Sequence, residues 1–262
     1  VSTALKVADV AFNLAAIEEA TLQAADQGVQ LLVFPELAMT GYSCGDLFYQ
    51  QSLLEKVREG LTTLTALSEQ TGMILIVGAP VRQSGRLFNA AVVMSHGRIC
   101  GVVPKTFLPN TQEFYEERWF SSAFDLVDDQ LAWLDEAPPF GTDLLFDVDG
   151  MPDCLFGIEI CEDAWVANPP SGAMAAAGAT LLINLSASPE ILGKCSYRRA
   201  LVEAQSARCL SAYLYASAGP GESSTDLVFS GHSLVAQYGQ ILAETERFQF
   251  ASQMAVADID VQ

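Results

Sequence analysis

Histidine is almost missing from this sequence, which has only His96 and His232 among its 262 residues. The two stand far apart, and neither lies in a cluster of possible metal ligands. Structural zinc sites use closely spaced cysteines and histidines, and a Ser-His-Asp triad needs a histidine as its base. We therefore expect no metal site and no histidine-based triad.

Basic residues are also scarce: 13 lysines and arginines face 32 acidic residues, for a net charge of −19. Phosphate backbones and anionic membrane surfaces repel such a chain, so we expect no nucleic-acid or membrane partner. No uninterrupted apolar run approaches the ~20 residues of a membrane span, and no signal peptide is visible. The chain begins at Val1 with a strand-like pattern over residues 1–5, so we expect a start segment to be missing from it.

Phosphate-binding loops and paired cysteines are missing as well. Neither an SGGxDS-like stretch nor GxxxxGK[ST] occurs, and the small-residue stretches 184–188 and 219–225 lack the required spacing. None of the six cysteines stands in C-x-x-C spacing, and several lie in apolar runs. Such cysteines are typical of reduced thiols in the cytoplasm, which is where we expect the protein to reside.

Half of the residues are hydrophobic, which at this length suits one large α/β domain over residues 1–262. Apolar periodicity predicts helices at 13–27, 50–70 and 196–210 and a short helix after Pro169-Pro170. It predicts strands at 30–34, 73–77, 87–95, 98–103, 180–184, 212–217, 232–237, 240–244 and 253–260. Two hairpins interrupt the alternation of strands and helices, which excludes a simple doubly wound parallel sheet.

One long segment, residues 106–142, has no clear periodicity. It is polar and acidic but contains several aromatic residues. Irregular segments of this length are usually functional or disordered, and the aromatic content favours an ordered, packed wall.

The segment Gly157–Trp165 contains the main candidate for chemistry. It begins as a buried strand and then breaks at Cys161, which two acids follow. A free cysteine at such a position is commonly a small apolar filler. The alternative is a nucleophile held where strand turns into loop, with backbone N–H groups nearby to receive an oxyanion. Adjacent acids do not lower a thiol pKa, so a reactive Cys161 needs a base and a cation from elsewhere.

Two other strand ends supply these groups. Glu36 follows the apolar run 31–34, and Lys105 follows Val102-Val103 after a proline. Each alone is more often a solvated loop residue. In α/β sheets, however, the carboxyl ends of strands are where sites are built, so we expect Glu36, Lys105 and Cys161 to meet at one sheet edge.

Glutamate, lysine and cysteine in this order resemble the signature of the nitrilase (carbon–nitrogen hydrolase) superfamily. Longer segments resemble the glutaminase domain of the glutamine-dependent NAD synthetase family, and the similarity covers essentially the whole chain. They are FPELAMTGYSCGDLFYQ, PKTFLPNTQEFYEERWF, GIEICEDAWVANPPS, INLSASP and SARCLSAYLYASAGPGESSTDLVFSGHS. The resemblance implies a four-layer α-β-β-α sandwich, whereas periodicity alone indicates only mixed α/β sheets.

The resemblance also implies roles for the three residues. Cys161 would carry the acyl group, Glu36 would serve as base and acid, and Lys105 would stabilise the oxyanion with a backbone N–H after Cys161. A lysine beside a glutamate and a thiol keeps its charge more readily than a lone buried lysine. The superfamily often adds a second carboxylate after the lysine; we assign it to Glu116, with Glu113 as the rival and a solvated loop acid as the alternative for either.

Substrate contacts implied by the resemblance fall on residues that flank the thiol. They are Thr111, Ser188 and Lys194, with Glu162 and Tyr42 as further candidates. Thr111 stands where the family commonly has tyrosine, and Lys194 stands where it commonly has arginine. Lysine offers a cation without the bidentate fork of arginine. For Tyr42 a packed core tyrosine is the competing interpretation.

The expected reaction is hydrolysis of the side-chain amide of L-glutamine to glutamate and ammonia, and it needs no cofactor. ATP, Mg and deamido-NAD would be required only by an attached synthetase domain, which this sequence lacks, and homo-oligomers are expected from the family. Two alternatives remain: a free-standing amidase acting on another small amide, and a catalytically dead assembly module. The intact Glu36, Lys105 and Cys161 argue against the second.

Overall fold

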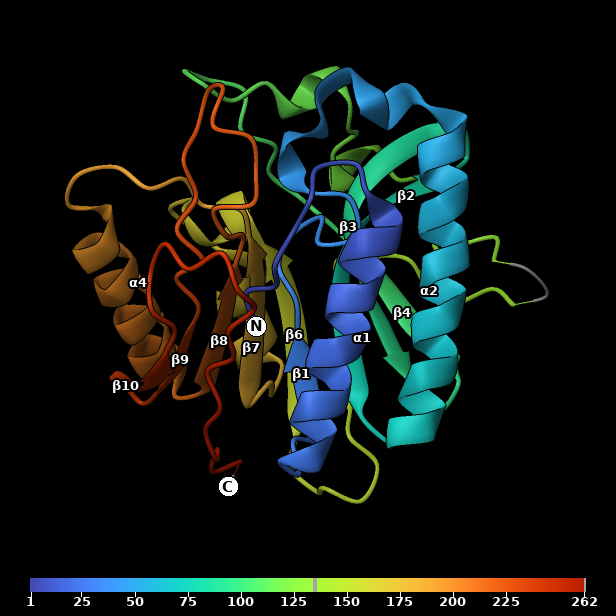
Figure 1. Ribbon diagram of the computed structural model, residues 1–262. Coiled ribbons are helices and arrows are strands. Elements are labelled where there is room, and N and C mark those ends of the chain that lie inside the picture. The colour runs from blue at the N-terminus through green and yellow to red at the C-terminus, as the bar shows by residue number, and fades with distance from the viewer. Residues whose placement is uncertain (134–135, 262) are drawn as a thin grey trace.

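The computed structural model describes residues 1–133 and 136–261, which form two facing β-sheets between two layers of helices (Figure 1). The first sheet has the strand order β1-β2-β3-β4. Its strands span Leu31–Val33, Ile74–Gln83, Arg86–Ser95 and Arg98–Pro104. The second sheet has the order β10-β9-β8-β7-β6-β5. From β5 to β10 its strands span Leu145–Asp147, Leu155–Ile160, Leu181–Ser186, Ala212–Ser217, Leu234–Gln237 and Gln240–Glu244.

Helices cover the outer face of each sheet. The first sheet carries α1 (Val10–Asp26) and α2 (Gln51–Thr71), and the second carries α3 (Pro170–Ala176) and α4 (Lys194–Cys209). Short 3₁₀ turns occur at Tyr42–Tyr49 (η1), Glu116–Arg118 (η2), Ala123–Asp125 (η3) and Cys161–Ala164 (η4). The predicted α-β-β-α sandwich is therefore confirmed.

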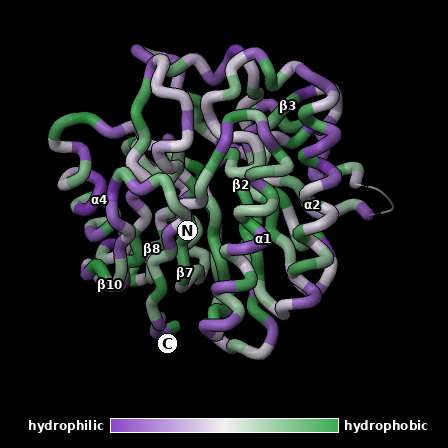
Figure 2. Tube along the Cα trace, viewed as in Figure 1, coloured by the Kyte–Doolittle hydropathy of each residue, from purple (hydrophilic) through white to green (hydrophobic). Residues whose placement is uncertain are grey.

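Alternation along the strands creates the layers. In β2, Leu75 and Val77 pack toward the helices, while Ile76 between them packs toward the other sheet. In β7, Ile183 faces the first sheet and Leu182 faces α4. Figure 2 shows the sheets rich in hydrophobic residues, with hydrophilic residues gathered on the outer helices and loops. The central strands of each sheet are thus buried on both faces, and apolar cores between the described layers hold them together.

Strand direction places the predicted site residues at one edge. β1 runs parallel to β2, and β4 shares that direction because β2-β3 and β3-β4 are antiparallel. β6 and β7 are also parallel neighbours. The segments that follow β1, β4, β6 and β7 therefore meet at one end of the sandwich, at the top of Figure 1.

Several element boundaries differ from the sequence prediction. Residues 1–5 and 253–260 form no strand; Ser2 and Gln253 make an isolated antiparallel bridge. The alternating apolar residues of 253–260 instead pack singly against the cores, as Met254 and Ile259 do, so the pattern is satisfied without a partner strand. The first helix begins three residues earlier than expected because Asp9 caps it by accepting from the backbone N–H of Phe12.

The irregular segment 106–142 is ordered in its described residues, as predicted, and contains short turns. Its rings pack on their neighbours: Phe120 lies 4.9 Å from Phe48, and Phe107 lies 5.7 Å from Phe124, between ring centroids. Residues 134 and 135 of this segment lie outside the described residues. None of the helices described combines the length and apolar character needed to cross a bilayer.

Candidate active site

Glu36 lies two residues beyond the apolar run that contains β1, and its side chain is fully buried. Oε1 accepts from Nζ of Lys105 at 2.7 Å and from Nδ2 of Asn89 at 2.6 Å. Oε2 accepts from the backbone N–H of Ala187 at 2.7 Å. Donors from both sheets therefore fix the carboxylate in one orientation.

Gly78 of β2 allows the loop that carries Glu36 to lie directly on the strand. A Cβ at this position would be 2.3 Å from the carbonyl oxygen of Pro35 and 2.4 Å from the nitrogen of Leu37. The backbone of the loop occupies the space that any side chain would need. Glycine is therefore required at position 78 to place Glu36.

Lys105 follows β4 and is fully buried, and it bridges two carboxylates. Nζ donates to Glu36 at 2.7 Å and to the two oxygens of Glu116 at 2.7 and 2.9 Å. Glu116 also accepts from the hydroxyl of Tyr42 at 2.8 Å. Burial opposes the charge on Lys105, but Glu116 and Glu36 outweigh it and raise the lysine pKa well above its ordinary value.

Glu116 shows the cost of placing two carboxylates around one cation. Burial raises its pKa to about 7, and the neighbouring charge of Glu36 adds to this, whereas Lys105 and Tyr42 oppose it. One ammonium cannot fully compensate two buried carboxylates. Burial and the charge of Glu36 thus make the Glu116 carboxylate easier to protonate than an exposed glutamate.

Cys161 is the first residue after β6 and adopts a left-handed backbone conformation, with φ of +46°. Residues other than glycine seldom adopt such a φ, and here it turns the chain sharply where the strand ends. Burial and the charge of Glu36 raise the pKa of the Cys161 thiol, whereas Lys105 and the backbone N–H of Ala187 lower it. The thiol thus lies within electrostatic reach of the cluster formed by Glu36, Lys105 and Glu116, and is held protonated.

Asp163 fixes the turn that carries Cys161 to the loop that follows Lys105. Its carboxylate accepts from the backbone N–H groups of Ile160 at 2.9 Å and Phe107 at 2.8 Å. Ile160 ends β6 of the second sheet, and Phe107 lies in the segment that follows β4 of the first sheet. Asp163 therefore sets the position of the thiol relative to the lysine, a role that the sequence did not reveal because its partners are backbone groups.

Asn89 and Ala187 also escaped sequence interpretation. The side-chain amide of Asn89 donates to Glu36, and the backbone carbonyl oxygen of Asn89 accepts from the backbone N–H of Lys105 at 2.8 Å. An amide within the apolar strand β3 was the available signal. Ala187 contributes only its backbone N–H, for which no sequence signal exists.

The predicted substrate residues after β7 lie beside the cysteine turn. Ser188 is buried, and its hydroxyl has no hydrogen-bond partner among the described residues. Nζ of Lys194 lies 4.9 Å from the ring centroid of Trp165. Burial lowers the pKa of Lys194, although the charge of Glu162 favours its protonated form. Burial raises the pKa of Glu162, whereas the positive charges of Lys105 and Lys194 lower it.

The remaining candidates are placed differently. Thr111 is exposed, and among the described residues its side chain forms no hydrogen bond to the buried cluster. Of the two rival acids, Glu116 contacts Lys105, whereas Glu113 acts by charge on Lys194. The hydroxyl of Tyr42 is engaged by Glu116, which makes the packed interpretation of this tyrosine the better description.

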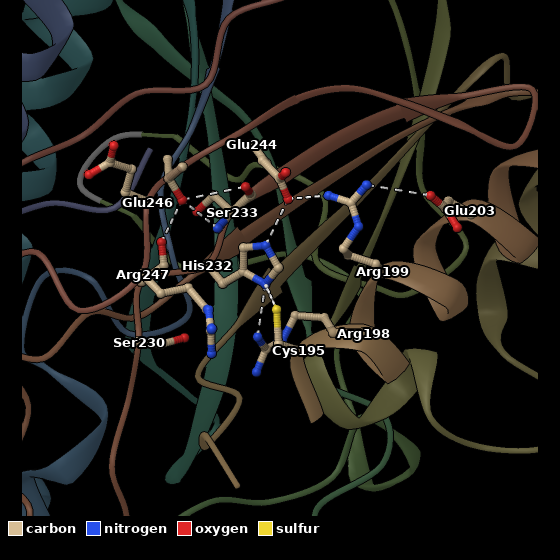
Figure 3. Close-up of polar contacts among 12 residues, drawn as sticks. Cys195, Arg198, Arg199, Glu203, Ser230, His232, Ser233, Glu244, Glu246 and Arg247 are labelled. Carbon is tan, nitrogen blue, oxygen red and sulfur yellow. Dashed lines mark hydrogen bonds and ion pairs between the residues drawn. The ribbon is translucent and has the colours of Figure 1, made fainter. Parts of the chain in front are cut away.

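A separate polar cluster supports the segment after Ser188 (Figure 3). Nη1 of Arg198 is 3.1 Å from Nδ1 of His232 and 3.1 Å from Glu190. Arginine can only donate, so Nδ1 accepts and the proton lies on Nε2, which is 3.1 Å from Glu244. Burial, with Arg198, lowers the pKa of His232, although Glu244 opposes this shift. His232 is therefore a neutral structural residue here.

A cavity of about 550 Å³ lies between the sheets, beside the C-terminal segment 254–261. It is lined by residues that precede or begin β1, β2 and β6, such as Gln30, Ile74 and Cys154. Neither Glu36, Lys105 nor Cys161 lines it. Its position separates it from the chemistry described above.

Taken together, the buried groups can perform acyl transfer from an amide. A thiol, a carboxylate hydrogen-bonded to a lysine, and a backbone N–H converge from four strand ends. These are a nucleophile, a proton carrier and donors for an oxyanion. No group of three or more potential metal ligands occurs among the described residues.

The sequence matches the Carbon-nitrogen hydrolase family over residues 2–262. It is 43% identical to the glutamine-dependent NAD(+) synthetase of Mycobacterium tuberculosis over 257 residues, which are 98% of this chain and 38% of that protein. The corresponding protein of Mycobacterium leprae is 40% identical, with the same coverage. The chain thus spans less than two-fifths of the length of these relatives.

Solved structures give the same result. A glutamine-dependent NAD(+) synthetase from Cytophaga hutchinsonii matches with a TM-score of 0.83 and 30% identity, over 94% of this chain and 40% of that one. An amidase from Nesterenkonia sp. matches with a TM-score of 0.75 and 22% identity, over 94% of this chain and 84% of that one. At that lower identity the second match shows a shared fold alone.

Proposed function

The chain belongs to the carbon–nitrogen hydrolase family, and from this premise we propose that it hydrolyses the side-chain amide of L-glutamine to glutamate and ammonia. The observation that carries the proposal is the carboxylate of Glu36, which bonds to Lys105 and to the backbone N–H of Ala187 beside Cys161. The named relatives, which are glutamine-dependent NAD synthetases, support glutamine as the amide.

In the proposed reaction Glu36 removes the thiol proton as sulfur attacks the amide carbon. A bond forms between Sγ of Cys161 and that carbon, and the carbonyl oxygen becomes an anion that Lys105 and a backbone N–H stabilise. Glu36 then returns the proton to the leaving nitrogen, which departs as ammonia. Water, deprotonated by Glu36, attacks the thioester, and glutamate leaves as the thiol is restored.

The raised pKa of the Cys161 thiol fits this order of events. The free site holds a neutral thiol because burial and Glu36 disfavour a second anion. Deprotonation is then coupled to transfer onto Glu36, which leaves one negative charge on sulfur near the Lys105 ammonium. The net charge of the site does not change during attack, which keeps the desolvation cost low.

Recognition of the amino-acid end of glutamine is proposed for the residues around the turn. Ser188 and Lys194 would bind the α-carboxylate, and Glu162 would bind the α-amino group. The unpartnered hydroxyl of Ser188 supports this assignment, because buried hydroxyls normally have a partner. Thr111 would join only if its loop moved inward when substrate binds.

The wider context is also a proposal, since the relatives are much longer than this chain. The ammonia would serve NAD synthesis from deamido-NAD on a synthetase domain outside this chain, and ATP and Mg would bind there. Residues 1–262 would form one glutaminase domain, cytoplasmic and part of a homo-oligomer. Sedimentation velocity at micromolar concentration tests the last point.

The test of the proposed function is labelling with an electrophilic glutamine analogue, 6-diazo-5-oxo-L-norleucine, followed by peptide mapping. We expect a single adduct at Cys161, although it is 7% exposed and Cys195 is more accessible. Protection by L-glutamine, but not by small aliphatic amides, would separate glutaminase from a general amidase. Labelling at Cys195 instead, or equal protection by all amides, would contradict the proposal.

A further inference from the structure

The loop between β8 and β9 carries an acidic residue that no sequence motif singles out and that has no part in the proposed reaction. Glu222 is buried, and its carboxylate reaches the segment after β1, which belongs to the other sheet. Both segments lie at the top of Figure 1, above the sandwich. The contact therefore spans the two sheets on the side of the active site.

Glu222 receives its hydrogen bonds from two consecutive residues. The backbone N–H of Tyr42 donates at 2.7 Å and that of Ser43 at 3.0 Å, and the Ser43 hydroxyl donates as well. Ser43 in turn accepts from the backbone N–H of Ser223 at 2.8 Å. A Cβ at Gly41, where φ is +85°, would lie 3.1 Å from Glu222, so glycine leaves room for the carboxylate.

The residue held in this way is the one that contacts the catalytic cluster. The Tyr42 hydroxyl donates to Glu116 at 2.8 Å, and Glu116 bonds to Nζ of Lys105. A continuous series of bonds therefore runs from Glu222 through the backbone and side chain of Tyr42 to Glu116 and Lys105. The tyrosine can hold Glu116 only while its own backbone stays in place.

Burying this acid is costly, and the cost has no obvious structural return. Burial raises the pKa of Glu222, and the charge of Glu36 adds to this increase. The hydrogen bonds from the backbone N–H groups and the Ser43 hydroxyl lower the pKa. Burial raises the pKa of the nearby Cys44 thiol, and the charge of Glu222 adds to this increase. A buried carboxylate without a cation is a poor way to stabilise a loop when an apolar residue would pack there.

We propose that Glu222 is a positioning residue that acts through Tyr42 to hold Glu116 against Lys105. It contacts neither substrate nor reacting atoms. This inference rests on the proposed function only where turnover is measured. The groups that face Glu116 are Lys105, Glu36 and Tyr42, and loss of the tyrosine bond would raise the pKa of Glu116 further.

The test compares Glu222→Gln with Glu159→Gln. Glu159 is a matched control, because it is also a buried carboxylate that accepts from a backbone N–H, that of Ser171, and from a hydroxyl, that of Tyr213. It lies under α3 on the outer face of the second sheet. Each variant is assayed for glutamine kcat and KM, and for the pH dependence of Cys161 alkylation by iodoacetamide.

We expect Glu222→Gln to lower kcat about 10- to 100-fold with KM within about twofold, since small displacements of a catalytic group have effects of this size. The alkylation profile should move to lower pH, because a Glu116 that holds its proton longer places less negative charge beside the Cys161 thiol. In a Tyr42→Phe background Glu222→Gln should add nothing further. Glu159→Gln should lower the thermal midpoint while leaving kcat and the profile unchanged.

A Glu222→Gln variant with wild-type kcat and an unmoved alkylation profile would overturn the inference. Multiplicative effects of Glu222→Gln and Tyr42→Phe would do so too, because independent residues multiply. If Glu222→Gln does not fold, Ser43→Ala removes one donor and should shift the same profile by less. Wild-type protein that fails to hydrolyse glutamine would refute the proposed function, whereas the alkylation profile would still decide the role of Glu222.

Discussion

The cluster formed by Glu36, Lys105 and Glu116 contains two acids but only one cation. Lys105 is the one cation bonded to both Glu36 and Glu116 in the described structure, so each acid depends on it. Removing the lysine leaves two buried carboxylates without compensation, and removing Glu36 takes away the proton acceptor that we propose for the thiol.

Glu36→Gln and Lys105→Ala should each lower glutamine turnover by about 10²-fold or more, the usual effect of losing a proton carrier or an oxyanion donor. Steady-state assays of ammonia release measure this, with Lys56→Ala as an exposed control. Circular dichroism should show folded proteins. Near-normal turnover in a folded Lys105→Ala variant would refute the oxyanion role.

Glu116 and Glu113 form a natural pair for comparison. Glu116→Gln should reduce kcat about 10-fold or more, because it removes the carboxylate that orients Lys105. Glu113→Gln should leave kcat within about twofold, since Glu113 acts on Lys194 and not on Lys105. Equal kcat losses in both variants would contradict the assignment of the accessory acid.

The residues that could be predicted from the sequence are those whose chemistry depends on their side chains alone. Glu36, Lys105 and Cys161 each follow an apolar run, and the structure places them at one edge. Asp163 and Ala187 could not be predicted, because they act on or through backbone groups of distant segments. Spacing in the sequence carries no information about such partners.

At the scale of elements, the site is built from the segments that follow strands. Strands β8 and β10 coincide with the predicted ranges 212–217 and 240–244, because polar or turn residues bound each apolar run. The segment from Ala187 to Gly193 has no regular structure. Its path is fixed by hydrogen bonds to distant residues, such as those of Ala187 with Glu36 and of Glu190 with Val228, and by the network around Arg198. Its geometry therefore could not be predicted.

Ser188→Ala and Lys194→Ala should raise KM for glutamine about ten- to a hundredfold with kcat little changed. Loss of a charge-assisted bond in a desolvated pocket costs about 1.5–3 kcal/mol, and it affects KM when ground and transition states share the bond. Full kinetics on glutamine decide the matter. An unchanged KM in both variants would move the binding end toward Glu162 and residues 111–116.

At the scale of the molecule, buried acids make stability depend on pH. Burial raises the pKa of Asp163 to about 7 from its ordinary 3.8. The folded state then binds this proton more tightly than the unfolded state does. The resulting stabilisation is complete below about pH 4 and is lost as pH rises through 7.

Asp163→Asn isolates this contribution. The free energy of unfolding of wild type relative to the variant should fall as pH rises from 5 to 7, by at most about 1.4 kcal/mol per pH unit. Urea denaturation at several pH values measures the difference. A difference that stays constant or rises across this range would show that Asp163 is ionised in the folded protein.

The four-layer arrangement followed from the family resemblance and not from periodicity. Alternation of apolar and polar residues indicates that a strand is buried, but not which sheet it joins. In residues 253–260 the same alternation occurs in a segment that joins neither sheet. Long-range pairing depends on contacts that no local pattern records.

The division of the site between two sheets has a consequence for how the protein can fail. Glu36 and Lys105, the proposed base and cation, follow strands of one sheet, and Cys161 and Ala187 follow strands of the other. A chain whose sheets have not docked, or have come apart, keeps its nucleophile but has no base to activate it. Under the proposed function, such a molecule should release no ammonia from glutamine. In urea, ammonia release should then vanish before the helical signal does, and coincident transitions would show that docking and secondary structure are lost together.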